Sequence, residues 1–314
     1  MQRFSEVQRQ NEKGNILPKR STKLNESEHE VDNEQTQIEA RDLQRYKNFK
    51  PHSTFMTQLW AQYRRRVTSY FNNTKEIYLS MYPFILPMMY TIILLMVLDN
   101  IDIDEDTKQT VLSTIFPILI SIGILTSAGI FVHAPVMDRE DKLRYLLNFA
   151  GMRSSSYYIG FLLGDLIVFA IPQILLIIMV FVLQLTQFQE HMVAFFGTVF
   201  IYAFSFISMI YVFNFVFDKA ESAFKYVILL VLIVYAVPQL VTIGAGPPVQ
   251  YAMDAIFPPH AFSSNMGQIL STGVNWEIYM RMGFMIVQCF VFMTIAITID
   301  NRNIHKFRGK DTNV

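Results

Sequence analysis

The stretch DREDKLRYLLNFAGMRSSSYY, residues 138–158, places seven charged residues between two of the most apolar runs of the chain. Within it, apolar residues recur at the i, i+3, i+4, i+7 spacing of one helical face, namely Leu143, Leu146, Leu147 and Ala150. Gly151 stands where such a helix would end, and the serines at 154–156 can cap a following helix. The pattern predicts a short amphipathic helix outside the hydrocarbon, and its simplest interpretation is a helix on the membrane surface.

Six apolar runs around this stretch approach or exceed the roughly 20 residues that a helix needs to cross a bilayer. They cover residues 77–98, 111–132, 157–183, 192–217, 223–245 and 278–299. The 314-residue chain is 52% hydrophobic and has no net charge, and its charges cluster outside these runs. Because soluble cores rarely hold apolar runs of this length, the sequence predicts an all-α, multi-pass integral membrane protein with six transmembrane helices.

Lysines and arginines gather in alternate connections between these runs. Arg64–Arg66 precede the first run, the 138–158 stretch follows the second, and a basic tail from Arg302 follows the sixth. The connection at residues 99–108, DNIDIDEDTK, is strongly acidic instead. Because cytosolic connections carry the excess of basic residues, both termini and the 138–158 stretch are predicted to face the cytosol.

Composition divides the chain into four parts. Residues 1–50 are polar and low in aromatic residues, which predicts a disordered tail. Residues 51–76 predict an amphipathic elbow helix at the membrane interface, with a stripe formed by Met56, Trp60, Tyr63, Val67, Tyr70 and Phe71. Residues 77–299 then form the six-span domain, and residues 300–314 form a basic tail.

Motifs for chemistry are missing from the sequence. It contains no G-x-x-x-x-G-K-[ST] phosphate loop, no Cys and His at metal-ligand spacing and no plausible Ser/His/Asp set. We therefore expect no catalytic residue, metal ligand or cofactor site in this chain, and no nucleic-acid partner. Asp165 is the main charge inside a predicted span, which makes it a functional candidate. A structural bond to nearby hydroxyls or to Arg153 is the equally weighted alternative.

The order of these features resembles the membrane domain of A-subfamily ABC transporters, the type-2 exporter fold of lipid-moving pumps, over about residues 55–300. Four segments carry the resemblance: QLWAQYRRRVTSYFNNTKEIYLSMYPFILPMM, DREDKLRYLLNFAGMRSSSYYIGFLLGD, FDKAESAF and AIFPPHAFSSNM. In the second segment the family's motif positions are taken by Asp138, Arg139, Glu140, Gly151, Tyr157 and Asp165.

In that family the second segment is the coupling element that docks on the nucleotide-binding domain. The resemblance implies that the apolar stripe seats the helix on the membrane domain and that its charged face contacts an ATPase. The residues assigned to this coupling role are Asp138, Arg139, Glu140, Lys142 and Gly151. The fourth segment implies an outer re-entrant hairpin around Phe257, Pro258, Pro259 and His260, and a loop lying flat at the surface is the alternative.

Full transporters of that family carry a fused ATPase and twelve spans. They also hold a large outer domain between the first two spans, where this chain has about ten residues. This chain is therefore expected to be a half-size transmembrane subunit of an exporter for lipid or another amphiphile, a fragment, or a degenerate relative. Its partners would be a second six-span half, membrane lipid and an ATPase subunit that holds ATP and Mg²⁺. A non-transporting membrane scaffold derived from such a transporter is the alternative function. An ion channel or secondary transporter is disfavoured, because the spans lack paired acids and broken polar helices.

Overall fold

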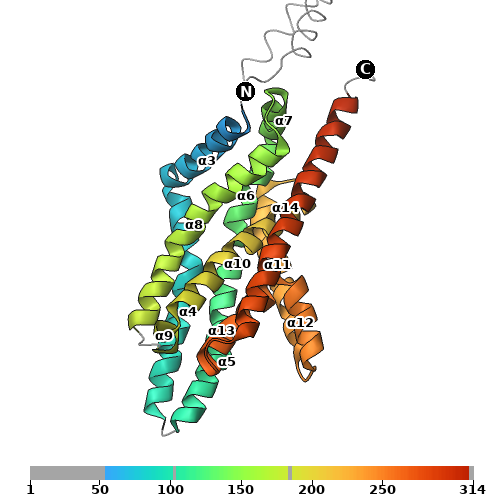
Figure 1. The fold of residues 1–314 in the computed structure, drawn as a ribbon. Coiled ribbons are helices and arrows are strands. Elements are labelled where there is room, and N and C mark those ends of the chain that lie inside the picture. The colour runs from blue at the N-terminus through green and yellow to red at the C-terminus, as the bar shows by residue number, and fades with distance from the viewer. Residues whose placement is uncertain (1–53, 102–103, 183–185, 311–314) are drawn as a thin grey trace, which may run out of the picture. The chain divides into compact units, whose positions relative to one another are not determined.

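The computed structural model describes residues 54–101, 104–182 and 186–310, and every regular element in these ranges is a helix (Figure 1). In chain order these are α3 (Phe55–Asn72), α4 (Thr74–Asn100), α5 (Glu105–Thr126), α6 (Ala128–Glu140), α7 (Leu143–Phe149), α8 (Ser154–Val182), α9 (Thr186–Glu190), α10 (Met192–Phe213), the 3-10 helix η1 (Asn214–Val216), α11 (Ala220–Thr242), α12 (Pro247–Ile256), α13 (Pro258–Ser271) and α14 (Trp276–Lys310). The predicted all-α class is confirmed for these residues. The predicted polar tail at residues 1–50 lies outside them.

Five stretches are long and apolar enough to cross a membrane. They are Thr110–Glu140, Ser154–Val182, Met192–Val216, Ala220–Thr242 and Trp276–Ile304. These coincide with five of the six predicted spans, so the multi-pass character of the protein is confirmed. The first predicted span, residues 77–98, lies within α4, whose described apolar stretch Met88–Leu98 is shorter than a span. The six-span topology therefore stays a prediction.

The first of these stretches reaches further than the sequence predicted. Helices α5 and α6 follow one another at Ser127, whose hydroxyl donates to the Ile124 carbonyl over 2.6 Å. Together they continue to Glu140, beyond the predicted end of the span at residue 132. At about 1.5 Å per residue, 31 helical residues measure roughly 46 Å, which exceeds the ~30 Å hydrocarbon thickness. The last turns of α6 therefore have the length to project beyond the hydrocarbon.

Helix α10 contributes much of the core. In its most apolar stretch 67% of the residues are buried, against 22% in α11 and 28% in α14. Aromatic rings fill the contacts of α10 with its neighbours: Tyr202 stacks on Phe262 of α13 at 4.2 Å, and Phe206 meets Phe131 of α6 edge-on at 6.3 Å. The exposed apolar faces of α11 and α14 are the surfaces that lipid or another span would cover.

Helix α3 packs along α8 with a largely polar face inward. Its buried residues lie four apart, which places them on one face: Gln58, Gln62, Arg66 and Tyr70. Two glycines of α8 permit this approach, because a Cβ atom at Gly160 or Gly164 would lie 2.8 Å from the Cβ atom of Gln62 or Arg66. Several members of the predicted apolar stripe face outward, namely Met56, Trp60 and Phe71. An interfacial position for α3 stays a prediction that these exposed side chains favour.

Two short helices, α12 and α13, occupy the place of the predicted re-entrant hairpin. Phe257 joins them, and Pro258 and Pro259 stand in the first turn of α13, where proline is tolerated because its missing N–H has no helical partner there. Helix α13 packs closely on α5, since a Cβ atom at Gly267 would lie 3.5 Å from the Ser113 carbonyl oxygen. How deeply this helix pair enters a bilayer stays a prediction.

Candidate functional site

The single amphipathic helix predicted after residue 138 is divided between the end of α6 and the separate helix α7. Asp138, Arg139 and Glu140 complete α6, and α7 begins only at Leu143. Between the helices Lys142 takes a left-handed backbone conformation with φ of 59°, which costs a non-glycine residue on the order of 1–2 kcal/mol. Gly151 follows α7 with φ of 89°, the conformation that glycine adopts most readily at a helix end.

The charged residues at the end of α6 bind elements of the chain itself. Asp138 is buried and accepts hydrogen bonds from the Arg65 guanidinium of α3 and, over 2.7 Å, from the Tyr157 hydroxyl of α8. Arg139 donates to the side chain and carbonyl of Asn214 in η1. The Glu140 carboxylate accepts from the backbone N–H of Ala220 over 2.8 Å, at the start of α11. Asp138 is thus only 4% exposed, and its predicted contact with an ATPase stays a prediction.

Helix α7 is held by an arginine, and the predicted apolar stripe is only partly turned inward, since Leu147 packs against the core and Leu146 is exposed. Arg144 is 1% exposed and donates to the Asp300 carboxylate of α14 over 2.5 Å and to the Ser154 hydroxyl over 2.8 Å. Its guanidinium also lies 4.6 Å from the centre of the Tyr157 ring. Leu146 and Phe149 are 61% and 52% exposed. This corrects the prediction in part, because a charge-assisted pair seats the helix together with Leu147, while Leu146 of the stripe projects outward.

Gln58 of α3 fixes the turn after α7. Its side-chain amide donates to the Gly151 carbonyl over 3.0 Å and accepts from the Arg153 backbone N–H over 3.1 Å. The α7 end of the bundle, meaning α3, α7 and the neighbouring ends of α6, α8, α11 and α14, is thus joined by contacts among all these elements.

Asp165 has partners other than the predicted Arg153. The carboxylate is fully buried and accepts from Arg66 Nε over 2.5 Å and from the Tyr211 hydroxyl of α10 over 2.7 Å. Arg66 also donates to the Glu76 carboxylate of α4 over 3.2 Å. A hydroxyl partner for Asp165 was predicted, and Tyr211 supplies it. The arginine partner, however, is Arg66 of α3, the predicted elbow helix.

A second buried charge cluster lies at the α12–α13 pair. The Asp254 carboxylate binds His260 Nδ1 and Arg281 Nε, each over 2.7 Å, and Ser264 donates to it over 3.2 Å. His260 Nε2 lies 3.3 Å from the Thr242 hydroxyl at the end of α11. The sequence analysis missed Asp254 as a partner of His260. Two features of the sequence could have indicated the cluster: Asp254 stands six residues before this histidine, and Arg281 lies in an otherwise apolar helix.

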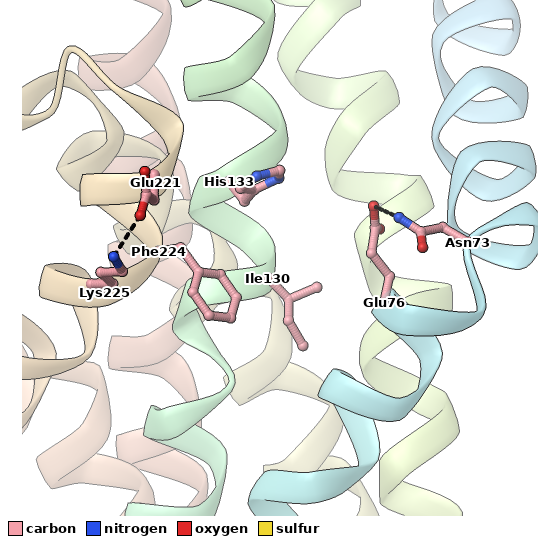
Figure 2. A pocket seen from close by; sticks show the side chains of 7 residues that line it. All are labelled: Asn73, Glu76, Ile130, His133, Glu221, Phe224 and Lys225. Carbon is pink, nitrogen blue, oxygen red and sulfur yellow. Dashed lines mark hydrogen bonds and ion pairs between the residues drawn. The ribbon is translucent and has the colours of Figure 1, made fainter.

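A pocket of about 330 Å³ opens beside α6 at the first turns of α4 and α11 (Figure 2). The residues that line it are Asn73, Glu76, Ile130, His133, Glu221, Phe224 and Lys225. The Phe224 ring lies against Gly129 of α6, where a Cβ atom would be 3.1 Å from the ring. Figure 2 shows Glu76 with Asn73 on one side, the Glu221–Lys225 pair on the other, and Ile130 and Phe224 between them. The pocket therefore joins an apolar floor to two charged sides.

A second, polar cleft of about 190 Å³ lies beside α7. Its lining residues come from α6, α7, the η1–α11 connection and α14: Arg139, Glu140, Tyr145, Phe215, Phe217, Asp218 and Asn303. Arg139 and Glu140 thus line a surface cleft as well as binding their partners inside the chain.

The fold and these sites define a multi-pass helical membrane protein whose polar machinery is concentrated at helix ends. Comparison with protein families gives the class a name: residues 97–298 match the ABC-2 family transporter protein family. The chain belongs to this family, and it is a membrane component of the ABC transporter type. No curated protein matches the chain in sequence.

Proposed function

We propose that the chain is the transmembrane half of an ATP-driven exporter of lipid or another amphiphile, with ATP hydrolysed by a partner subunit bound at α7. The observation that carries the proposal is the way α7 is mounted. Arg144 ties it to α8 and α14, Gln58 ties the following turn to α3, and Glu140 ties the preceding helix to α11. A displacement of α7 would therefore act on several candidate spans together.

The proposed docking face differs from the one expected from sequence. Leu146 and Phe149 project at i and i+3 from a helix whose inner side holds Arg144 and Leu147. Partly desolvated apolar anchors with a polar rim are the usual source of interface affinity. Exposed Lys142 and the cleft residues Arg139 and Glu140 supply that rim. Asp138 acts from inside, by fixing α6 to α3 and α8.

A non-transporting scaffold is the second candidate. It is favoured by the short connection between α4 and α5, which are separated only by residues 101–104 where A-subfamily transporters usually hold a large outer domain. A scaffold would keep the same internal contacts without an ATPase at α7.

Co-purification from the native membrane separates the two functions. The transporter proposal expects a protein with nucleotide-binding motifs to accompany the wild-type chain. Leu146→Ser with Phe149→Ser should reduce its recovery by about tenfold or more, as expected for the loss of interface anchors. Phe71→Ser is the matched control, because Phe71 of α3 is equally exposed at the same end of the bundle. If the wild-type chain recovers no such protein, the scaffold function replaces the transporter.

A further inference from the structure

The pocket beside α6 carries an excess of negative charge. A single guanidinium, that of Arg66, binds two carboxylates, Asp165 at 2.5 Å and Glu76 at 3.2 Å. Asp165 is fully buried, whereas the Glu76 side chain is 20% exposed and lines the pocket. Opposite, Glu221 and Lys225 form an ion pair of 2.5 Å and cancel one another. The Asn73 amide donates to the other Glu76 oxygen over 3.0 Å, and Arg66 is the cation paired with Glu76 among the side chains that the structure describes. One guanidinium thus serves two carboxylates beside the pocket.

The position of the pocket matches the headgroup layer of a membrane. Glu76 stands in the first turn of α4, and Glu221 in the first turn of α11, a membrane-capable helix. Two exposed tyrosines stand close to lining residues in the sequence, Tyr78 two residues after Glu76 and Tyr226 one residue after Lys225. Tyrosine is enriched where hydrocarbon meets water. Ile130 and Phe224 form the apolar floor of the pocket at the same level as these helix ends.

The occupant that this chemistry selects is an amphiphile that carries an ammonium group. A volume of about 330 Å³ accommodates a headgroup and the start of the acyl chains, not a whole phospholipid. A primary ammonium can donate charge-assisted hydrogen bonds to the Glu76 carboxylate. Quaternary ammonium groups are recognised by cages of several aromatic rings, whereas the lining offers one benzene ring, Phe224, beside the His133 imidazole. The pocket therefore favours ethanolamine over choline.

We infer that this pocket binds the ethanolamine headgroup of a phospholipid, with the ammonium on Glu76 and the glycerol and upper acyl chains over Ile130 and Phe224. The inference rests on the proposed function in one respect, since it names the amphiphile class that the transporter would take up. Binding itself needs no ATPase, so it can be tested on this chain alone.

The direct test is competition for a photoactivatable ethanolamine phospholipid on the purified full-length chain in detergent micelles. Crosslinks should fall on peptides containing residues 73–78, 130–133 and 221–226. Unlabelled ethanolamine phospholipid should compete about tenfold better than choline phospholipid with identical acyl chains, the effect of one charge-assisted hydrogen bond. Lipids with one, two and three N-methyl groups should lose potency stepwise, as N–H donors are removed. Soluble phosphoethanolamine should not compete, because it lacks the apolar part.

Substitutions locate the preference at Glu76. Glu76→Gln keeps the side-chain shape but removes the charge, and it should abolish the tenfold preference. The matched control is the double substitution Glu221→Gln with Lys225→Gln, which removes a neutral pair from the same pocket and should retain the preference. Equal competition by ethanolamine and choline lipids on the wild-type chain would overturn the inference, as would a preference that survives Glu76→Gln. The methylation series needs only wild-type protein, so it decides the matter even if Glu76→Gln fails to fold. Recovery of an ATPase from the same membranes reports separately on the proposed function.

Discussion

Buried ion pairs hold both ends of the helical bundle, but they join different kinds of neighbour. At the α7 end, Arg144 meets Asp300, 156 residues away, and Arg66 meets Asp165, 99 residues away. At the α12–α13 pair, Asp254 meets His260 and Arg281 at separations of only 6 and 27 residues. The α7 end is therefore cross-linked between distant segments, whereas the α12–α13 cluster fastens consecutive helices to one another.

This difference bears on how the two regions would move. Contacts between distant segments oblige α3, α6, α7, α8, α11 and α14 to shift together at one end. The α12–α13 pair is joined to α11 by Thr242 and Tyr235 and to α14 by Arg281, and α13 also packs on α5 and α10. A force applied at α7 would thus spread first through the elements joined there, and it would reach the α12–α13 pair through α14 and α11.

The largest expected effect concerns the membrane topology, namely the sides on which the basic 138–158 stretch and the acidic connection at residues 99–108 lie. In a Cys289→Ser background, cysteine placed at Lys142 and at Thr107 should react with a membrane-impermeant reagent from opposite sides. Both positions are exposed, so accessibility reports orientation and not burial. Labelling of both from one side would contradict the predicted topology and would place the two regions on a single face.

Breaking the Arg144–Asp300 pair should cause the largest loss of stability. Arg144→Ala leaves a carboxylate that is 2% exposed without its cation, which costs roughly 3–5 kcal/mol. Thermal unfolding in detergent measures the loss. Lys225→Ala is the control, since its ion pair with Glu221 is solvent-exposed and should leave the unfolding temperature unchanged. A small effect of Arg144→Ala would show that α7 is seated by something else.

Closing the gap between α3 and α8 should have an intermediate effect. Gly160→Ala places a methyl group 2.8 Å from the Gln62 Cβ and the Leu59 carbonyl oxygen, so α3 must shift, at a cost of about 1–3 kcal/mol. Gly283→Ala in α14 is the matched control, because its Cβ would meet no atom within 4 Å. Helix propensity favours alanine there by about 1 kcal/mol. In the same unfolding assay, Gly160→Ala should therefore lower the unfolding temperature and Gly283→Ala should raise it.

The smallest expected effect tests the bond between α11 and the α12–α13 cluster. Thr242→Val removes the hydroxyl that lies 3.3 Å from His260 Nε2, which should cost about 1 kcal/mol. The Asp254–His260 and Asp254–Arg281 pairs remain, so the cluster should stay closed. A loss as large as that of Arg144→Ala would mean that this bond carries more than the local geometry indicates.

Much of the fold could be predicted from the sequence because helix length and helix ends are local properties. Apolar runs gave five membrane-capable helices, and Gly151 was placed correctly after α7. The continuation of α6 to Glu140 was missed, since its last turns are polar and are helical because Arg65, Tyr157 and Ala220 satisfy their side chains. The hydrophobic periodicity of a segment carries no information about such partners in other segments.

The site was harder to predict because its decisive contacts are distant in sequence. The leucine stripe of α7 suggested an apolar base, and nothing local indicates that Arg144 meets Asp300. The same applies to α3, where Gly160 and Gly164 permit a polar face to pack tightly. Asp165 was recognised as a buried acid, but its arginine came from a helix predicted to lie outside the spans.

Crosslinking from α7 tests the central claim most directly. A photoreactive benzoylphenylalanine at Phe149, incorporated in the native membrane, should form an adduct with a protein that carries nucleotide-binding motifs. The same residue at Phe71, which is also exposed at the α7 end, should not. An adduct at Phe149 alone is the predicted result. If the probe at Phe149 forms no adduct with a nucleotide-binding protein, in membranes where the chain is correctly folded, the assignment of α7 as the coupling helix is contradicted.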